Sequence, residues 1–229
     1  MQSIVSINFA SDQWTKSIPR DCFIDRDDAI IDYCSDRTVL HIGAADAPFD
    51  LEKGKRGELL HQKIKRVASS VLGVDVDEGA VKRLESLGIE DICICDITQK
   101  ESEYLYGKNF EIILCCDVIE HVNNPGALIG ACRRYMAKES ILIVTTANAT
   151  GIKPAIRALQ GREAVHCDHV CYYSYSTLCQ LLIKCNFRPD AFGVFSYPTL
   201  NPLVGRISRA IMRRFPGASD GIFLTAKLI

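Results

Sequence analysis

Several familiar patterns are missing from this sequence, and the first is a disulfide framework. The chain has 11 cysteines, an odd number, and no two of them form a C-x-x-C pair. Cys93 with Cys95, and Cys115 with Cys116, lie in apolar runs, where a free cysteine packs as a small hydrophobic side chain. We therefore expect reduced thiols and a reducing compartment.

Leader and membrane-spanning patterns are missing as well. The first 14 residues contain Asn8, Asp12 and Gln13, where a leader peptide would have a basic start and an apolar core. No apolar run approaches the roughly 20 residues that a membrane span requires. These absences predict a soluble, cytoplasmic protein.

The chain has little excess of charge of either sign. With 27 basic and 28 acidic residues, its formal net charge is −1 and its isoelectric point is about 6.5. Non-specific nucleic-acid binding depends on a basic field, so we do not expect a nucleic-acid partner. Proline is scarce, with eight residues, while a hydrophobic content of 48% suffices for one sizeable core among 229 residues. We expect one domain over residues 1–229.

The sequence does contain a regular alternation of apolar runs and helix-like segments. The apolar runs are continuous, which is typical of strands that helices cover on both faces. Strands are expected at 39–42, 70–75, 92–96, 110–117, 140–146, 191–196 and 221–228. Helices are expected at 28–34, 58–68, 79–87, 126–136, 176–185 and 202–215, and the stretch from 147 to 169 is expected to be irregular. The pattern predicts a doubly wound α/β sheet.

The stretch from Thr38 to Ala47 runs from a short apolar strand into a turn of small residues. An acidic strand end, Val74-Asp75, follows one strand–helix unit later. Small residues let the backbone approach a ligand closely, and a carboxylate at the tip of the next strand can accept hydrogen bonds from two ribose hydroxyls. This combination predicts a site for an adenosyl cofactor.

Four phrases in order make residues 36–196 resemble the class I S-adenosylmethionine-dependent methyltransferases. V-L-H-I-G-A-A-D-A at 39–47 corresponds to the family's V-L-D-I-G-x-G-x-G. G-V-D-V-D at 73–77 and C-D-I at 95–97 place acidic residues at the next two strand ends, and D-V-I-E-H follows at 117–121. The resemblance implies a Rossmann-like, mostly parallel sheet of seven strands with an antiparallel last strand. Residues 1–35 would then form an N-terminal cap, 36–196 the cofactor-binding core, and 197–229 a helical insertion and the last strand.

The same resemblance implies S-adenosyl-L-methionine as the cofactor. The residues it assigns to cofactor binding are His41, Gly43, Ala44, Ala45, Asp75, Val76, Asp96, Ile97, Cys116 and Asp117. Asp75 and Asp96 also have an alternative interpretation, because a carboxylate after a strand can be the N-cap of a helix.

Two departures from the family pattern affect the first turn. His41 replaces the acidic residue that usually ends the first strand, and Ala45 and Ala47 replace two of the three glycines. Alanine tolerates positive φ poorly, so the turn must either hold negative φ at these positions or bear strain. The departures leave a second hypothesis open, that of a noncatalytic cofactor-binding or scaffold relative.

The phrase from Asp117 to His121 has three interpretations. Glu120 and His121 can simply cap and stabilise a loop. A similar E-x-x-E-H binds a divalent ion in small-RNA 2′-O-methyltransferases and some ubiquinone-type O-methyltransferases, and here the ligands would be Asp117, Glu120, His121 and either His166 or His169. Many family members carry the phrase without a metal, and we expect no metal here.

His166 and His169 precede a run, 170–178, that resembles a family segment reading H-x-x-x-F/Y-S. Asn186-Phe187 stands where that segment continues to G-F, and Ser176 is expected to cap the intervening helix. The histidines fall on the carboxyl side of the sheet, where open α/β folds bind ligands, and a base near neutral pKa can deprotonate a hydroxyl. We therefore assign His166, His169 and His121 as candidate catalytic residues, although a structural role fits each histidine alone.

The expected reaction is transfer of a methyl group to a hydroxyl, or as a second choice an amine, of a small molecule or glycan. An activated sulfonium needs mainly proximity, alignment and a base, with no covalent enzyme intermediate. Metal-dependent methylation of an RNA or a quinone-type acceptor is the alternative within the family. The choice of a small-molecule acceptor is an analogy with the family.

Residues 202–215 form a helix-like insertion before the last strand. Leu203, Ile207, Ala210 and Ile211 share one side, and Arg206, Arg209, Arg213 and Arg214 supply a basic rim. The favoured interpretation is a surface helix that docks its apolar side on the domain. The alternative is peripheral contact with a membrane surface, which would leave Leu203 and Ile207 exposed.

Overall fold

The computed structural model describes residues 4–9, 12–99, 103–163, 165–199 and 201–229. Its eight strands are β1 (Val5–Ser6), β2 (Thr38–Ile42), β3 (Ser70–Asp75), β4 (Ile92–Ile94), β5 (Phe110–Cys116), β6 (Met136–Ala147), β7 (Phe187–Phe195) and β8 (Gly221–Leu228). Its α-helices are α1 (Arg26–Cys34), α2 (Asp50–Arg56), α3 (Leu60–Lys65), α4 (Glu78–Glu85), α5 (Pro125–Cys132), α6 (Ile152–Leu159), α7 (Tyr175–Lys184) and α8 (Pro202–Arg214). Single turns of 3₁₀ helix follow as η1 (Arg133–Tyr135) and η2 (Pro216–Ala218).

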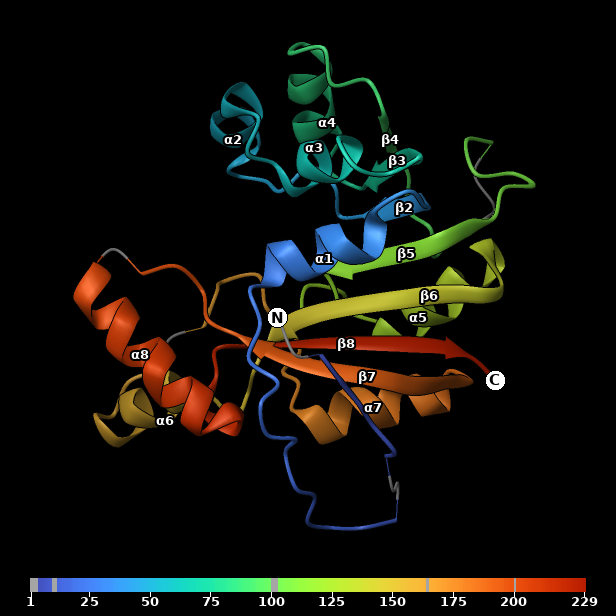
Figure 1. Cartoon of the computed structure of the whole chain (residues 1–229). Helices are drawn as coiled ribbons and strands as arrows, with labels where there is room; N and C mark the ends of the chain where they lie inside the picture. The colour runs from blue at the N-terminus through green and yellow to red at the C-terminus, as the bar shows by residue number, and fades with distance from the viewer. Residues whose placement is uncertain (1–3, 10–11, 100–102, 164, 200) are drawn as a thin grey trace.

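The strands form one sheet in the order β1-β7-β8-β6-β5-β2-β3-β4 (Figure 1). Strands β6, β5, β2, β3 and β4 are parallel neighbours, while β8 pairs antiparallel with both β6 and β7. The doubly wound Rossmann-like fold and the antiparallel last strand are therefore confirmed. The expected count of seven strands is one short, because Val5 and Ser6 add β1 antiparallel to β7 at the sheet edge.

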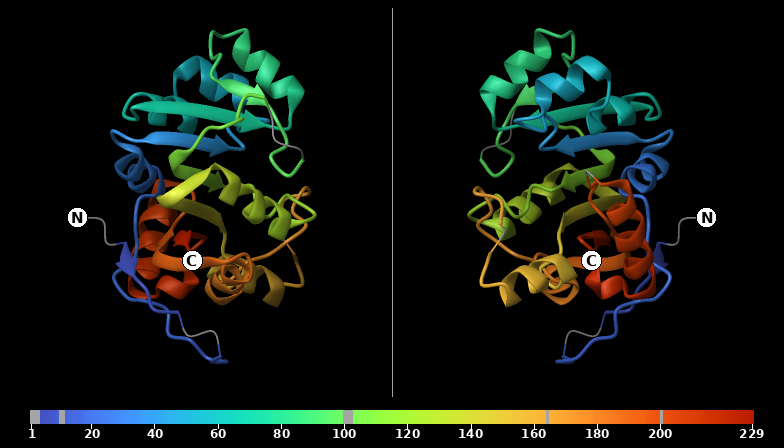
Figure 2. Two further views of the ribbon diagram at one scale, coloured as in Figure 1. Left: turned by 90° about the vertical axis from the view of Figure 1, so that its right-hand side faces the viewer. Right: turned by 90° about the vertical axis from the view of Figure 1, so that its left-hand side faces the viewer.

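Helices lie on both faces of the sheet (Figure 2), and the continuous apolar strands serve both layers. In β5, Ile113 and Cys115 pack into the cluster that contains the buried side chains of α5 and α7. Ile112 and Leu114 point the other way, into the cluster that contains those of α1. A period of two in a strand thus produces an uninterrupted apolar run whenever both faces are covered.

Polar side chains cap the starts of several helices. Asp77 accepts a hydrogen bond from the Ala80 N–H at 2.9 Å and begins α4, and Asn124 does the same for α5 through Ala127 at 3.0 Å. The cap of α7 is Ser174, in a capping box with Thr177, and not Ser176 as expected. Ser176 lies inside the first turn, where its hydroxyl is too late to cap.

Two helices appear where the sequence interpretation had loops. α2 follows the small-residue turn directly. The expected helix at 58–68 is shorter in the structure and corresponds to α3 at Leu60–Lys65. α6 occupies part of the stretch expected to be irregular, with Pro154 in its first turn, where proline is tolerated. The side chains of α6 are all exposed or half-buried, so none of them is part of the hydrophobic core. The expected helix at 126–136 ends at Cys132, because η1 and the start of β6 take its last residues.

The expected docking of the apolar side of α8 on the domain is wrong. Leu203 is 65% exposed and Ile207 is 54% exposed, and the buried residues of this helix are Gly205 and Met212. None of the helices among the described residues is both long enough and apolar enough to cross a bilayer.

Candidate active site

A cleft of about 1500 Å³ opens at the carboxyl edge of the parallel strands. The ends of β2, β3 and β5 line it together with the segments that follow β4 and β7, the 166–169 segment, and two arginines of α8. Open α/β sheets place ligands at this edge, because the loops that leave neighbouring strands diverge there. The cleft has two ends, one at β2–β4 and one at β5–β7.

The turn after β2 has positive φ angles at Gly43 and Asp46. Gly43 has φ +73°, and a Cβ there would lie 2.3 Å from Cγ2 of Val118, so only glycine fits. Asp46 has φ 59°, a conformation that a short polar side chain accepts more readily than alanine does. Ala45 and Ala47 are not among the described residues with positive φ. The two alanines therefore hold negative φ and the strain considered above does not arise.

Asp75, at the end of β3, ties the small-residue turn to the next helix. Its Oδ2 accepts a hydrogen bond from the Ala45 N–H at 2.9 Å, and its Oδ1 accepts one from the Asp77 N–H at 3.0 Å. Each carboxylate oxygen keeps a second lone pair for a ligand. Asp75 faces the cleft and the helix N-cap is Asp77, so the capping alternative for Asp75 is wrong.

Asp96 and Ile97 line the cleft beyond β4, and Val76 lines it beside Asp75. Burial pushes the pKa of Asp96 upward, but hydrogen bonds from Thr98 and Gln99 outweigh it, so the pKa lies below its ordinary value. The Thr98 hydroxyl donates to Oδ1 at 2.7 Å. Buried Ile97 and the 71%-exposed Val76 supply apolar surface between these carboxylates.

His41 is buried beneath the turn and faces the cleft. Its ring stacks on that of His61 with centroids 5.6 Å apart and an interplanar angle of 15°. Burial, followed by the neighbouring His61 and Arg26, holds the pKa of His41 well below its usual range. The imidazole is thus neutral, and its Nδ1 has no hydrogen-bond partner among the described residues.

Asp117 directly follows β5 with φ 53° and is held by three side chains from other elements. Nη2 of Arg26 lies 3.1 Å from Oδ2, while the Tyr197 hydroxyl and the Thr145 hydroxyl donate to Oδ1 at 3.1 and 3.2 Å. Burial and the charge of Asp117 raise the pKa of Tyr197 well above its usual value, so the phenol stays protonated as a donor. Burial likewise raises the pKa of the adjacent Cys116 thiol to about 12, which makes it inert as a nucleophile.

Glu120 points into the protein and not into the cleft. It is 2% exposed, its Oε1 accepts from the Ala147 N–H at 3.4 Å, and its Oε2 has no partner among the described residues. Burial and the nearby Asp117 raise the pKa of Glu120 to about 7. Its backbone carbonyl accepts the N–H groups of Val170 and Cys171, at 2.9 and 3.2 Å. Glu120 therefore positions the segment that carries His169.

Three histidines converge at the β5 end of the cleft. The ring of His121 lies with its centroid 4.6 Å from that of His169 and 5.6 Å from that of His166. Burial, and then the positive charges that His121 and His166 can carry, lower the pKa of His169. Near neutral pH this imidazole is an acceptor, as a general base must be.

The structure brings together only part of the metal set considered from sequence. One ring nitrogen each of His121, His166 and His169 lies within 4.8 Å of the others, close enough to share an ion. The expected carboxylates do not join them, because Asp117 is engaged by Arg26 and Glu120 is turned into the core. The mixed carboxylate and imidazole site therefore does not fit this arrangement.

A family model described as "Methyltransferase domain" matches residues 26–191, from the start of α1 into β7. The chain belongs to this methyltransferase family. Among curated proteins, it is 29% identical over 148 residues to the ubiquinone biosynthesis O-methyltransferase of Parvibaculum lavamentivorans, covering 59% of this chain and 56% of that one. It is 30% identical over 130 residues to the Caulobacter vibrioides protein of the same name, covering 54% and 51%. The chain thus spans little more than half the length of these relatives.

Solved structures show the same fold. Magnesium protoporphyrin IX methyltransferase from Synechocystis PCC 6803, with bound SAH, superposes with a TM-score of 0.59 at 14% identity, covering 89% of this chain and 82% of that one. A SAM-dependent methyltransferase from Archaeoglobus fulgidus superposes with a TM-score of 0.57 at 19% identity, covering 88% and 91%. The family match places this chain among S-adenosylmethionine-dependent methyltransferases, and the solved structures share its fold.

The cleft of this methyltransferase is lined by nearly all the residues assigned from sequence. Ala45 is the exception, since its side chain is fully buried and only its N–H participates, toward Asp75. The remaining assigned residues line one continuous cavity: His41, Gly43, Ala44, Asp75, Val76, Asp96, Ile97, Cys116, Asp117, His121, His166 and His169. The glycine cradle at Gly43, the open lone pairs of Asp75 and the unpartnered Nδ1 of His41 fit an adenosyl cofactor.

Sequence reasoning missed Arg26 and Tyr197. Arg26 opens α1 in the segment interpreted as a cap without cofactor motifs, and Tyr197 follows β7. Arg26 precedes Asp27 and Asp28, so its charge looks locally satisfied in the sequence. Only the fold shows that the N-terminal segment reaches the end of β5, about 90 residues away in the chain.

Proposed function

We propose that this enzyme methylates a hydroxyl of a small molecule, with His169 as the base. The observation that carries the proposal is the cluster of three imidazoles across the cleft from the β2–β4 end, with Asp117 and Tyr197 beside it. The names of the curated relatives support an oxygen acceptor of the quinol or catechol class over a glycan.

In this proposal the residues at the β2–β4 end hold the cofactor. Asp75 accepts from the ribose hydroxyls with its remaining lone pairs, Gly43 lets the backbone approach, and Val76 and Ile97 contact the adenine ring. S-Adenosylmethionine supplies an activated methyl group on a sulfonium, whose transfer releases S-adenosylhomocysteine. The protein therefore contributes alignment of the acceptor oxygen and removal of its proton.

His169 suits proton removal because its lowered pKa keeps it unprotonated near neutral pH. A phenolic hydroxyl that donates to the ring nitrogen would lose its proton as the oxygen attacks the methyl group. The rings of His121 and His166 lie close enough to His169 for a neutral one of them to take the proton onward from it. The inert thiol of Cys116 has no part in this chemistry.

A second candidate is metal assistance, which the convergence of the same three imidazoles favours. An ion held by three histidines would lower the pKa of the acceptor hydroxyl directly, and His169 would then be a ligand and not a base. The two candidates differ in their response to chelation.

The test uses catechol and aniline as paired acceptors, with isotopically labelled S-adenosylmethionine and mass spectrometry of the products. We expect methylated catechol and little methylated aniline, and a rate reduction of about 10²- to 10⁴-fold in His169→Ala. Tyr172→Phe is the matched control, because Tyr172 neighbours His169 with ring centroids 6.3 Å apart but does not line the cleft. In the wild type, kcat/KM should fall only on the acid side of neutrality, where His169 becomes protonated.

Turnover that survives both His169→Ala and His166→Ala across the pH range would show that the base is elsewhere. Activity that is lost with a chelator and restored by a divalent ion would replace the base by the metal candidate. Preferred methylation of aniline would overturn the oxygen acceptor while leaving the cofactor site untouched.

A further inference from the structure

Helix α8 contacts the rest of the protein through a narrow strip. Its buried residues are Gly205 and Met212, and half-buried Ser208 lies between them at helical spacing. A Cβ at position 205 would lie 2.6 Å from Oγ1 of Thr199, so the glycine brings the helix close to the preceding segment. Residues spaced three and four apart share a helix face, so 205, 208 and 212 define the buried face of α8, and Arg213 lies over the Phe23 ring, 5.5 Å from its centroid.

A second face of α8, which we call the α8 apolar stripe, is left to solvent. Its members are Leu203, Val204, Ile207 and Ile211, with exposures of 65%, 51%, 54% and 40%. The stripe spans two turns of the helix and is next to the packed strip. Four large apolar side chains in one exposed row indicate an interaction surface.

The charge around the stripe has one sign. Arg206, Arg209, Arg213 and Arg214 belong to α8, and no acidic residue occurs from position 191 to position 219. Arg209 and Arg213 line the cleft as well, so the basic side of the helix borders the active site. A chain whose formal net charge is −1 thus concentrates positive charge here.

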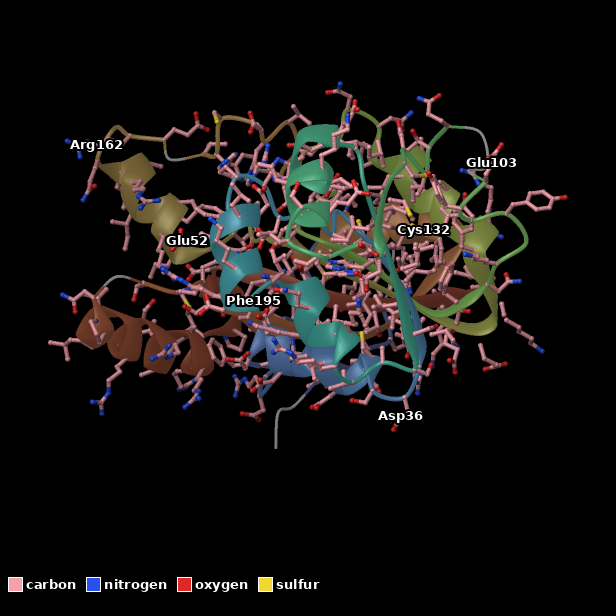
Figure 3. All side chains as sticks on the ribbon, turned by 90° about the horizontal axis from the view of Figure 1, so that it is seen from above. Asp36, Glu52, Glu103, Cys132, Arg162 and Phe195 are labelled. Carbon is pink, nitrogen blue, oxygen red and sulfur yellow. The ribbon has the colours of Figure 1, made fainter. Side chains whose placement is uncertain are left out.

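Helix α6 lies at the same end of the sheet as α8 (Figures 1 and 3) and also carries an exposed apolar face and basic residues. Ile152, Ile156 and Leu159 lie on one face with exposures of 38%, 46% and 90%, and none of the helix's residues is buried. Residues 149–162 include Lys153, Arg157 and Arg162 and no acidic residue. In Figure 3 Arg162 projects away from the body beyond the end of α6.

We propose that α6 and the α8 apolar stripe bind the surface of an anionic lipid bilayer, with the mouth of the cleft beside it. Amphipathic helices rich in arginine bury their apolar face at the headgroup boundary and gain from attraction to anionic lipids. Lys153 is paired with Asp220 at 2.6 Å, but the two segments also carry six arginines and no acidic residue, so they complement such a surface. A second copy of the chain fits poorly, since a two-fold contact would set these cations against one another.

The test measures sedimentation of the full chain with vesicles of equal parts phosphatidylcholine and phosphatidylglycerol, and with pure phosphatidylcholine. We expect binding to the anionic vesicles, weakened by salt, and little binding to the neutral ones. Arg206→Glu with Arg214→Glu should lower the partition coefficient about tenfold or more, since each cation near an anionic surface is worth roughly 1 kcal/mol. Neither residue lines the cleft, so methyl transfer to a soluble acceptor should be unchanged.

Lys138→Glu with Arg188→Glu is the matched control, because it makes the same charge change on exposed residues. These residues lie near the starts of β6 and β7, whereas the other ends of these strands lead to α6 and α8. It should bind vesicles like the wild type. Leu203→Ser with Ile207→Ser tests the apolar contribution without altering charge, and should also weaken binding. All six side chains named in these variants and their control are exposed, and circular dichroism checks that each variant folds.

Equal recovery of the wild type and the Arg206→Glu, Arg214→Glu variant with anionic vesicles would overturn the proposal. So would a wild-type dimer in sedimentation velocity that Leu203→Ser with Ile207→Ser converts to a monomer without any vesicle binding, because the stripe would then be a self-interface. Neither outcome bears on the proposed methyl acceptor, which is tested with soluble catechol.

Discussion

The two ends of the cleft hold their carboxylates by different means. At the β2–β4 end, Asp75 is fixed by backbone N–H groups, and Asp96 by Thr98 and Gln99 immediately after it in the chain. At the β5–β7 end, Asp117 is fixed by side chains that come from α1, from β6 and from the segment after β7. One end relies on backbone donors and on near neighbours in the chain, and the other relies on side chains from three separate elements.

This difference has an energetic consequence. A carboxylate that accepts backbone N–H groups and retains free lone pairs can be removed at modest cost, with its effect mainly on ligand binding. A carboxylate that depends on one arginine loses its charge partner when that arginine is removed, and the folded state then contains an uncompensated charge. Substitutions at the two ends should therefore separate into effects on affinity and effects on stability.

The largest effect is expected for Arg26→Ala. The change leaves the Asp117 carboxylate with two neutral donors. We expect a loss of about 2 to 4 kcal/mol in the free energy of unfolding. This is less than for a fully buried pair, because the two side chains are 23% and 26% exposed. Denaturant titration checks this. Arg56→Ala breaks an exposed pair with Glu52 and should cost less than about 0.5 kcal/mol. A similar small cost for Arg26→Ala would remove the distinction between the two ends.

Glu120→Gln should be stabilising above neutral pH. In the unfolded chain the carboxyl ionises near its ordinary value of 4.5, whereas the folded protein keeps the proton up to about pH 7. The folded state therefore loses stability as pH rises between these values, and at pH 8 the glutamine variant should be more stable by about 2 to 3 kcal/mol. Stability measured from pH 5 to pH 8 should be flatter for Glu120→Gln than for the exposed control Glu139→Gln. Parallel curves would mean that Glu120 is ionised without penalty.

The contrast also explains what the sequence could predict. The strand pattern, the turn at Gly43 and the acidic strand ends Asp75 and Asp96 are contiguous signals in the sequence. The two carboxylates are held by backbone N–H groups or by the residues that directly follow them. Asp117, His121, His166 and His169 could be proposed by analogy, and the structure places them on one cleft. Their roles in cofactor binding and catalysis are proposals.

Other features depended on contacts that no local pattern encodes. Arg26 reaches Asp117 only because α1 packs beside β2, and Glu120 is buried although it lies in the turn after β5. Leu203 and Ile207 have the spacing of a packed face, yet Gly205 and Met212 are what the body contacts. A hydrophobic period identifies a helix more reliably than it identifies which face is buried.

The account rests on cofactor binding at the β2–β4 end, and calorimetric titration with S-adenosylhomocysteine tests it most directly. Asp75→Ala should weaken binding by about 1.5 to 3 kcal/mol, since the ribose hydroxyls lose a carboxylate partner. Asp77→Ala is the matched control: it removes the α4 cap, which costs about 1 kcal/mol of stability, but Asp77 does not line the cleft and the affinity should not change. Unchanged affinity in Asp75→Ala, or no heat of binding in the wild type, would contradict the account.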